Sequence, residues 1–319
     1  MRVIMKKVLG YIVDTVMILA IAVALLYFYS QDYLKTSVPN EKVLFIPKGS
    51  TKSIINYLNK KGYNLNIIDY YFIKQNGYPQ AGWINLKEKN LSRRVFFQRL
   101  THSRAMGINI TLIPGETTHI VIEQLAKKYM LSVTKLHTFY DKFSPYKEGV
   151  IFADSYTFYK GISEEKLMKI LIEKSLKKHK ELSNKLLKKY NQKEWFEKYI
   201  TIASIITKEA ASTNEMKKIS SVIYNRLKKG MKLQMDGTLN HGKFSHDKVT
   251  PLMIKEDNSP FNTYKIKALP PYPICIVEPL SVDAAINPLK TTYLYFMKKD
   301  SKSHNFSSTY QGHLKNIKK

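Results

Sequence analysis

The chain has 319 residues, of which 44% are hydrophobic and 12% aromatic, so it is long enough for two folded units and is not a disordered protein. Cys275 is the single cysteine, which excludes internal disulfides and a small disulfide-stapled domain. The formal net charge is +27, but 46 of the 52 basic residues are lysines rather than the arginines that nucleic-acid readers favour. The charge therefore indicates an anionic membrane surface or an acidic polymer as partner, and no nucleic acid.

The N-terminal segment predicts a membrane anchor. After a short N-terminus (1–7), residues 8–29 are almost continuously apolar, which matches the length of a helix that crosses the hydrocarbon layer. Basic residues precede this run (Arg2, Lys6 and Lys7), so we expect a cytoplasmic N-terminus and an external C-terminal part. Asp14 is costly there unless it lies near the interface or is protonated. The alternative is a cleaved signal peptide, but the run is long and no small-x-small cleavage site follows it before Gln31.

Residues 30–41 are polar and predict a linker, and an internal repeat with a shift of 67 positions follows it. Phe45-Ile46-Pro47 recurs as Leu112-Ile113-Pro114, and Ser50-Thr51 recurs as Thr117-Thr118. Each copy predicts a short strand, a turn with a Ser or Thr cap, and an amphipathic helix. We therefore expect an N-terminal βα subdomain over 42–107 and a second one over 108–145. The second resembles a LysM module, a class that binds N-acetylglucosamine polymers; the alternative is a generic βα unit.

The remaining residues, 146–319, predict a mixed α/β domain, so the expected fold class is α+β. Residues 163–200 are lysine-rich and helical, which is typical of a solvated helix face. Residues 251–288 are rich in Pro, Asn, Ser and Tyr, which indicates ordered loops and short strands that line a cleft. Residues 293–297 predict a buried strand.

One helix, expected from about Trp195 to Ala211, carries a carboxylate on its apolar stripe. Glu209 follows Ile205 and Ile206 by four and three residues, so it lies on the same face as these side chains. Partial desolvation raises the pKa of a carboxyl group and favours the protonated form that a general acid needs. Taken alone, the pattern also fits a glutamate at the edge of a solvated face.

The residues around Glu209 and downstream of it resemble the YceG/MltG family of endolytic murein transglycosylases. Residues 202–210 are similar to the family's catalytic helix, A-S-I-I/V-E-K-E-A/T, with Thr207 in place of its first glutamate. Residues 225–238 resemble its N-R-L-x-x-G-M-x-L-Q-x-D-x-T run, and residues 259–264 resemble S-P-Y-N-T-Y. Similar motifs cover 148–156, 269–274 and 284–306. Residues 276–278 depart from the pattern: Ile-Val-Glu replaces N-P-G, so we expect an altered loop path there.

The resemblance implies a lyase that cleaves the linkage between N-acetylmuramic acid and N-acetylglucosamine in nascent peptidoglycan strands, with a 1,6-anhydromuramyl end as product. It implies Glu209 as the catalytic acid/base, and it suggests strand termination near penicillin-binding proteins or other cell-wall synthases. The substrate-binding residues that we expect are Gln234, Asp236, Asn262 and Tyr264. No cofactor is expected, and His241 and His246 form no recognisable metal pattern. The predicted location is the inner membrane, with the catalytic domain in the periplasm.

Two other functions remain open from the residues. A lysozyme-like hydrolase needs a second carboxylate, for which Asp236 and Glu215 are the candidates. A non-catalytic glycan-binding scaffold needs no acid at position 209. The products and the phenotype of Glu209→Gln separate these alternatives from a lytic transglycosylase.

Overall fold

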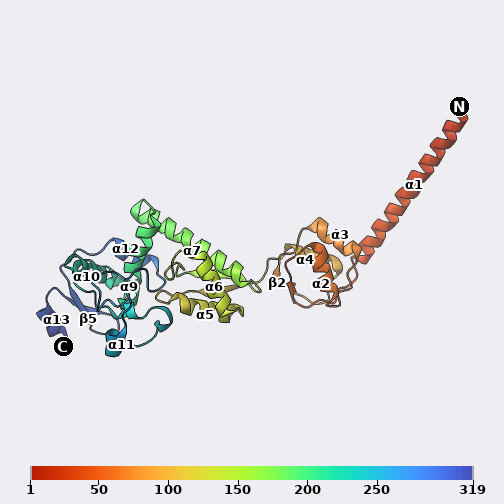
Figure 1. Ribbon diagram of the computed structural model, residues 1–319. Coiled ribbons are helices and arrows are strands. Elements are labelled where there is room, and N and C mark those ends of the chain that lie inside the picture. The colour runs from red at the N-terminus through yellow and green to blue at the C-terminus, as the bar shows by residue number, and fades with distance from the viewer. Residues whose placement is uncertain (1, 318–319) are drawn as a thin grey trace. The chain divides into compact units, whose positions relative to one another are not determined.

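The computed structural model describes residues 2–317, with side chains from residue 9 onwards (Figure 1). The chain forms two compact units. Unit 1 comprises the residues up to Ile108 together with Tyr159–Gly161, and unit 2 comprises Asn109–Phe158 and the residues from Ile162 onwards. The described elements are mostly helices, accompanied by three two-stranded sheets. This mixed α/β composition confirms the expected class at that level.

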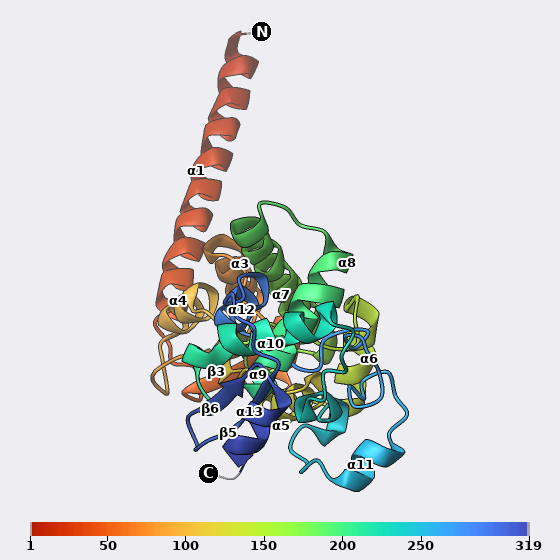
Figure 2. The ribbon, with the colours of Figure 1, turned by 90° about the vertical axis from the view of Figure 1, so that its left-hand side faces the viewer.

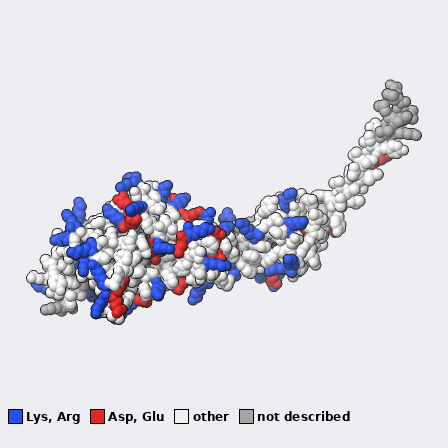
Figure 3. Space-filling model, viewed as in Figure 1, with Lys and Arg blue, Asp and Glu red and all other residues white. Residues whose placement is uncertain are grey.

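The first helix, α1 (Arg2–Tyr33), contains the anchor expected from the sequence. Its segment Leu9–Tyr33 is 25 residues long and apolar enough to cross a membrane, and none of its side chains is buried within the protein. The helix continues four residues beyond Tyr29, the expected end. In Figure 3 the part of α1 that is not grey is almost entirely white, so it has almost no charged side chains, whereas lysines and arginines are scattered over the visible faces of both units. The basic residues expected to orient the helix lie outside the residues whose side chains are described.

The predicted polar linker is largely part of unit 1. Leu34 and Val38 are buried, and the Val38 N–H donates to the Leu91 carbonyl oxygen at 2.7 Å. The Arg93 N–H likewise donates to the Thr36 carbonyl oxygen at 2.8 Å. Residues 34–38 are therefore packed and hydrogen-bonded, because two of their apolar side chains reach the core.

Unit 1 is built as a strand, two helices and a strand. These elements are β1 (Val43–Ile46), α2 (Thr51–Asn59), α3 (Ile67–Asn76) and β2 (Gly82–Asn85). The strands pair antiparallel, with Val43 opposite Asn85 and Ile46 opposite Gly82. A further helix, α4 (Arg93–His102), contributes the fully buried Phe96, Phe97 and Leu100 to the core.

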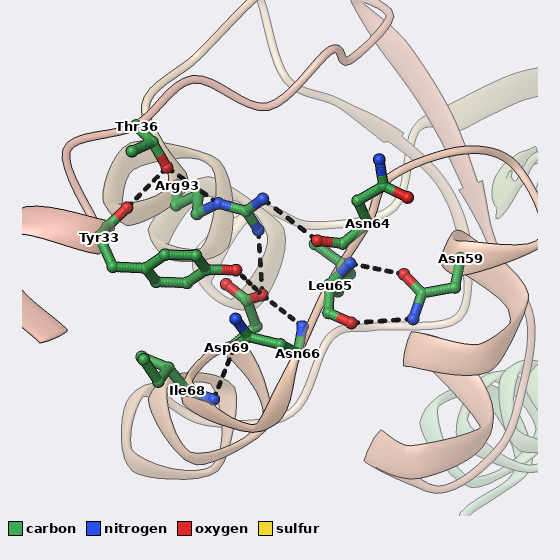
Figure 4. A network of polar contacts seen from close by, with 9 residues as sticks. All are labelled: Tyr33, Thr36, Asn59, Asn64, Leu65, Asn66, Ile68, Asp69 and Arg93. Carbon is green, nitrogen blue, oxygen red and sulfur yellow. Dashed lines mark hydrogen bonds and ion pairs between the residues drawn. The ribbon is translucent and has the colours of Figure 1, made fainter.

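A polar cluster holds the end of α1 to unit 1 (Figure 4). The Tyr33 hydroxyl donates to Asp69 Oδ2 at 2.8 Å, and Arg93 Nη1 donates to the same oxygen at 3.0 Å. The Arg93 guanidinium also lies over the Tyr33 ring, at 4.4 Å from its centroid. Asp69 is fully buried and Arg93 nearly so, so each charge depends on the other for compensation.

The second copy of the repeat, in unit 2 apart from its strand ends, has the same order of elements. It consists of β3 (Gly107–Thr111), α5 (Thr118–Tyr129), α6 (Val133–Phe143) and β4 (Ser155–Tyr159), and its two strands pair. The predicted caps are confirmed: Ser50 accepts from the Ser53 N–H in α2, and Thr117 accepts from the Ile120 N–H in α5. The sequence repeat thus extends over two strand–helix–helix–strand motifs.

The rest of unit 2 surrounds one buried helix, α9 (Thr201–Glu209), which packs against α10 (Met216–Lys228) and α12 (Pro279–Ile286) (Figure 2). The long basic helix α7 (Glu164–Leu187) comes earlier in the chain and is followed by the short α8 (Gln192–Glu194). The single α-helix predicted over 195–211 was wrong in two respects. It begins as a π-helix, Trp195–Ile200, and its α-helical part ends at Glu209.

The π-helix is held from inside the core. Trp195 Nε1 donates to His179 Nδ1 at 3.1 Å, and His179 Nε2 lies 3.2 Å from the Val150 carbonyl oxygen. Burial lowers the pKa of His179 to about 3, so this histidine is neutral and accepts the indole N–H. The Thr201 hydroxyl donates to the Phe196 carbonyl oxygen, five residues back, at 2.8 Å.

The C-terminal third contains short elements joined by loops. They are three 3-10 turns (Thr213–Glu215, Asp236–Leu239 and Gly242–Phe244), α11 (Pro251–Glu256), the antiparallel hairpin of β5 (Tyr295–Lys298) and β6 (His304–Ser307), and α13 (Tyr310–Ile317). Two predictions were inexact. Residues 251–288 contain two helices and an isolated parallel bridge, Phe152 to Val277, in place of short strands. The strand expected over 293–297 runs from Tyr295 to Lys298 and is only half-buried.

Candidate active site

Glu209 is the last residue of α9 and lies where the buried helix meets the surface. Ile205 and Ile206, one turn earlier, are fully buried, whereas Glu209 is half-buried. The following residue, Ala210, has an extended backbone and ends the helix. Glu209 Oε1 accepts a hydrogen bond from the Gly237 N–H at 2.8 Å. The carboxyl group is therefore fixed by one backbone donor and only partly solvated.

The surroundings of Glu209 favour its protonated form. Burial raises its pKa from the usual value of 4.5 to about 7, and the nearby charge of Asp236 acts in the same direction. The Gly237 N–H opposes this rise, because it stabilises the carboxylate. At neutral pH both protonation states are accessible, which is what a group that gives and then takes a proton requires.

Gly237 allows a close approach that no other residue would allow. A Cβ atom on this residue would lie 2.9 Å from Glu209 Oε1 and 2.6 Å from the Lys208 Cβ. Any side chain here would push the carboxyl group or the end of α9 out of place. Sequence reasoning missed Gly237, although its position between Asp236 and Thr238 in the 225–238 motif was a usable signal.

Asp236 and Tyr264 form a pair beside Glu209. The Tyr264 hydroxyl donates to Asp236 Oδ1 at 2.5 Å. Burial, the bond to Asp236 and the charges of Asp236 and Glu209 all raise the pKa of Tyr264, so the phenol stays protonated. Asp236 itself is exposed and Tyr264 is half-buried. Three of the five residues singled out from the sequence are therefore brought together.

Gln234 lies on the same segment and is exposed, with a left-handed backbone (φ 52°). Its N–H donates to the Thr263 carbonyl oxygen at 3.1 Å, and the next N–H, of Met235, donates to Thr263 Oγ1 at 3.1 Å. Arg226 also stabilises this segment, because its Nη1 donates to the Leu233 carbonyl oxygen at 2.6 Å. These bonds hold the segment that carries Asp236 and Gly237 in place.

Asn262 has a different position from the one expected. It is fully buried, and its Nδ2 donates to the carbonyl oxygens of Ile254 and Asp257 at 2.9 and 2.7 Å. Its Oδ1 accepts from the Tyr264 N–H at 3.1 Å. Its amide group is thus used to shape the loop that presents Tyr264.

The Pro-Gly-Glu-Thr turn of the second repeat copy packs beside the end of α9. The Gly115 N–H donates to the Ile276 carbonyl oxygen at 3.0 Å, and the Ile276 N–H donates to the Glu116 carbonyl oxygen at 2.9 Å. Thr117 Oγ1 donates to the Gly242 carbonyl oxygen at 2.6 Å. A Cβ on Gly115 would lie 3.7 Å from the Thr207 methyl group. The contact between this turn and the site therefore includes Thr207 and Ile276, which both depart from the family pattern.

Glu148 is a second acid with a raised pKa, about 7, mainly because it is buried. It accepts from the N–H of Thr118 at 2.9 Å, from the Thr118 hydroxyl at 2.5 Å and from the Gly149 N–H at 2.9 Å. The positive charge of Lys208 lowers its pKa in part, and Lys208 itself donates to the Ser245 carbonyl oxygen at 3.1 Å. Glu148 caps the start of α5, a role that sequence reasoning missed.

Glu215, the other candidate for a second carboxylate, is hydrogen-bonded to His304. It is buried and accepts from the His304 N–H at 2.5 Å, while its Oε2 lies 2.8 Å from His304 Nδ1. Asp236 is the acid whose charge acts on Glu209.

His241 and His246, which form no recognisable metal pattern in the sequence, have other contacts in the structure. His246 Nε2 lies 3.0 Å from Glu116 Oε2, the His241 ring stacks on Phe261 with centroids 4.4 Å apart, and Cys275 is buried. Within the described part of the chain, no group of three or more His, Cys, Asp or Glu residues could hold a metal ion.

The fold and the site define an α+β protein with an apolar helix long enough to cross a membrane and a half-buried carboxyl group, that of Glu209, with a raised pKa at the end of a buried helix. Residues 44–319 match the YceG-like family, and the chain belongs to it.

Relatives and a solved structure agree with this assignment. The chain is 31% identical to the endolytic murein transglycosylase of Bacillus subtilis (strain 168), over 91% of this chain and 88% of that protein. It is 29% identical to the endolytic murein transglycosylase of Streptococcus pneumoniae (strain R6), over 47% of this chain and 28% of that protein. A crystal structure of a yceG-like protein from Listeria monocytogenes superposes with a TM-score of 0.56 and 25% identity, over 86% of this chain and 97% of that one.

Proposed function

We propose that this protein is a peptidoglycan lytic transglycosylase, a lyase that cleaves glycan strands internally with Glu209 as its acid/base. The observation that carries the proposal is the Glu209 carboxyl group, half-buried, with a pKa of about 7 and beside the Asp236–Tyr264 pair. The names of the relatives from Bacillus subtilis and Streptococcus pneumoniae support the substrate class.

In the proposed mechanism one carboxyl group acts twice. Oε1 of Glu209 is held by the Gly237 N–H, which leaves Oε2 to carry the proton. Protonated Glu209 donates to the oxygen between N-acetylmuramic acid and N-acetylglucosamine, and the bond from the muramyl C1 to this oxygen breaks. The Glu209 carboxylate then accepts the proton of the muramyl C6 hydroxyl as this oxygen bonds to C1. No water is consumed, and the product has a 1,6-anhydromuramyl end.

Asp236 and Tyr264 are proposed to assist from beside Glu209. The charge of Asp236 raises the pKa of Glu209 in the resting state and stabilises the positive charge that develops at C1. The protonated Tyr264 orients Asp236 through its hydroxyl and offers its ring to a sugar. The exposed Gln234 is proposed as a further sugar contact, and the LysM-like copy at 108–145 as a second region of glycan contact.

The proposed location is the inner membrane. With α1 as a single-pass anchor, the basic residues before its apolar run (Arg2, Lys6 and Lys7) favour a cytoplasmic N-terminus and a periplasmic location for the residues after the helix. There the enzyme would act on nascent strands close to cell-wall synthases such as penicillin-binding proteins, and would terminate strand elongation.

Glu209→Gln is the decisive variant. Gln keeps the shape and the bond to the Gly237 N–H but has no acidic proton to transfer to the glycosidic oxygen. Anhydro-ended products should therefore fall by about 100-fold or more. The measurement is mass spectrometry of purified murein digested by the wild type and the variant, with Glu197→Gln, on the π-helix, as a control that should remain active. Undiminished digestion by Glu209→Gln would refute the assignment.

The same digests test the hydrolase alternative, which the proximity of Asp236 to Glu209 keeps relevant. A hydrolase adds water and leaves reducing ends, with Asp236 as the required second carboxylate. A lytic transglycosylase leaves anhydro ends in the wild type, and Asp236→Asn should slow it while the products remain anhydro-ended. Reducing ends in the wild-type digest would favour the hydrolase.

The pH dependence follows from the pKa of Glu209, about 7. The protonated form predominates below this pH and decreases about tenfold for each unit above it. We therefore expect the rate of bond cleavage to fall as the pH rises through about 7. In Asp236→Asn the negative charge that raises this pKa is removed, so the fall should begin at a lower pH. An identical profile in both proteins would contradict this role of Asp236.

A further inference from the structure

The point where α1 leaves the membrane is rigidly joined to unit 1. Tyr33 bonds to Asp69, at the start of α3, and lies under Arg93, at the start of α4 (Figure 4). Two residues before Tyr33, the Gln31 side chain accepts a hydrogen bond from Arg94. Because α1 and unit 1 are held by these contacts, the start of α3 stays at a defined height above the bilayer.

That height corresponds to the lipid headgroups. The apolar run ends at Tyr29, so Tyr33 lies about 6 Å further along the helix axis, at a rise of about 1.5 Å per residue. The headgroup zone is about 5–8 Å thick on each side of the hydrocarbon core. Ile67 and Tyr71 are each two residues from Asp69, or about 3 Å along the axis of α3.

The outward face of α3 exposes apolar and aromatic side chains together with a lysine. Ile67 and Tyr71 are 63% and 56% exposed, and Tyr78, just beyond the helix, is 68% exposed. Together with the exposed Lys74 they follow a spacing of four, three and four residues, which places the three helical members on one face. The opposite face contains the fully buried Ile73. We call the four outward residues, Ile67, Tyr71, Lys74 and Tyr78, the α3 stripe.

We propose that the α3 stripe lies in the headgroup layer of the same bilayer that α1 spans. Isoleucine and tyrosine side chains enter the boundary between headgroups and acyl chains, and a lysine pairs with anionic phosphates. Lipid is favoured over another protein because the stripe is continuous with α1 through the Tyr33–Asp69 contact. The inference rests on the proposed membrane placement of α1, and it gives unit 1 a second, peripheral contact with the membrane.

The test uses the full chain in vesicles of phosphatidylcholine and phosphatidylglycerol. Cys275 is buried and is replaced by Ala, so a single introduced cysteine carries a fluorescent label. Tyr71→Cys reports on the stripe, Lys48→Cys, in the exposed turn after β1, is the matched control, and Leu19→Cys reports on α1. With nitroxide on the lipid headgroups, the label at 71 should be quenched at least about twofold more than the label at 48.

The outcomes separate the two proposals. Equal quenching at 71 and 48, with the label at 19 quenched by acyl-chain nitroxide, would overturn the stripe contact and leave the anchor standing. A label at 19 that acyl-chain nitroxide does not quench would overturn both.

A second variant checks that apolar contact drives the effect. Ile67→Glu combined with Tyr71→Glu changes two exposed positions, so unit 1 should stay folded. A label at Tyr78→Cys should then lose its excess quenching. Retained quenching in this variant would also refute the proposal.

Discussion

The two strand–helix–helix–strand copies share a sequence pattern and an order of elements, but their capped turns have different surroundings. In unit 1 the turn that ends at Ser50 is exposed, and Ser50 bonds only locally, to Ser53. In unit 2 the corresponding Thr117 is fully buried and also bonds to Gly242, 125 residues along the chain. The same local motif is therefore an exposed turn in one unit and part of the surroundings of the candidate site in the other.

The copies also differ in how their cores use charge. Unit 1 buries an ion pair, Asp69 with Arg93, which secures the end of α1. Unit 2 buries Glu148 against the start of α5. Each unit thus has a buried acidic residue that the other copy lacks: Asp69, paired with Arg93, in unit 1, and Glu148 in unit 2. We expect the two acidic residues to act independently, and the following variants test this.

The largest expected effect is from Arg93→Ala. It leaves the buried Asp69 carboxylate without a compensating positive charge, which should destabilise unit 1 by about 3–5 kcal/mol. Amide hydrogen exchange on the full chain should show lost protection in unit 1 and unchanged protection in unit 2. Arg99→Ala is the control, because Arg99 pairs with an exposed Glu88, and it should cost clearly less. Equal loss of protection in both units would contradict their independence.

Glu148→Ala should have the next largest effect, and in unit 2. The N–H groups of Thr118 and Gly149 would lose their buried acceptor, at a cost of about 2–3 kcal/mol. Urea unfolding followed by fluorescence measures this loss. Glu123→Ala, at an exposed position of α5, is the control and should be close to neutral. If Glu148→Ala were also neutral, the cap at α5 would not contribute to stability.

The smallest effects come from the two caps, and they compare the copies most directly. Ser50→Ala and Thr117→Ala each remove a helix cap and should each cost about 1 kcal/mol. Only Thr117→Ala also releases Gly242, near the Lys208–Ser245 contact, so only this variant should slow glycan cleavage, by about threefold to tenfold. Equal cleavage rates in both variants would mean that the turn of the second copy does not support the site.

Some of this organisation could be predicted from the sequence, for clear reasons. The apolar N-terminal helix and both capped helices depend on patterns within about 30 residues, where apolar periodicity and capping chemistry decide the structure. The repeat is visible in the same chain as a shift of 67 positions. The placement of Glu209 on a buried face follows from the helical spacing to Ile205 and Ile206. These features are local, so a single chain is enough to predict them.

Other features could not be predicted, because they depend on contacts between distant segments. The π-helix at Trp195–Ile200 is stabilised by His179, and the packing of residues 34–38 requires Leu91 and Arg93. Asn262 has the hydrogen-bonding groups that a sugar-binding residue needs. Only the folded loop shows that its amide donates to backbone carbonyl oxygens instead.

The amino-acid sequence by itself determined the apolar N-terminal helix, the two capped helices of the repeat and the position of Glu209 on the apolar face of its helix. The tertiary structure decided what surrounds that acid, because Asp236 and Gly237 reach Glu209 from a segment 27 and 28 residues away. It is this surrounding that raises the pKa to about 7, since burial and a neighbouring charge arise only when the chain is folded.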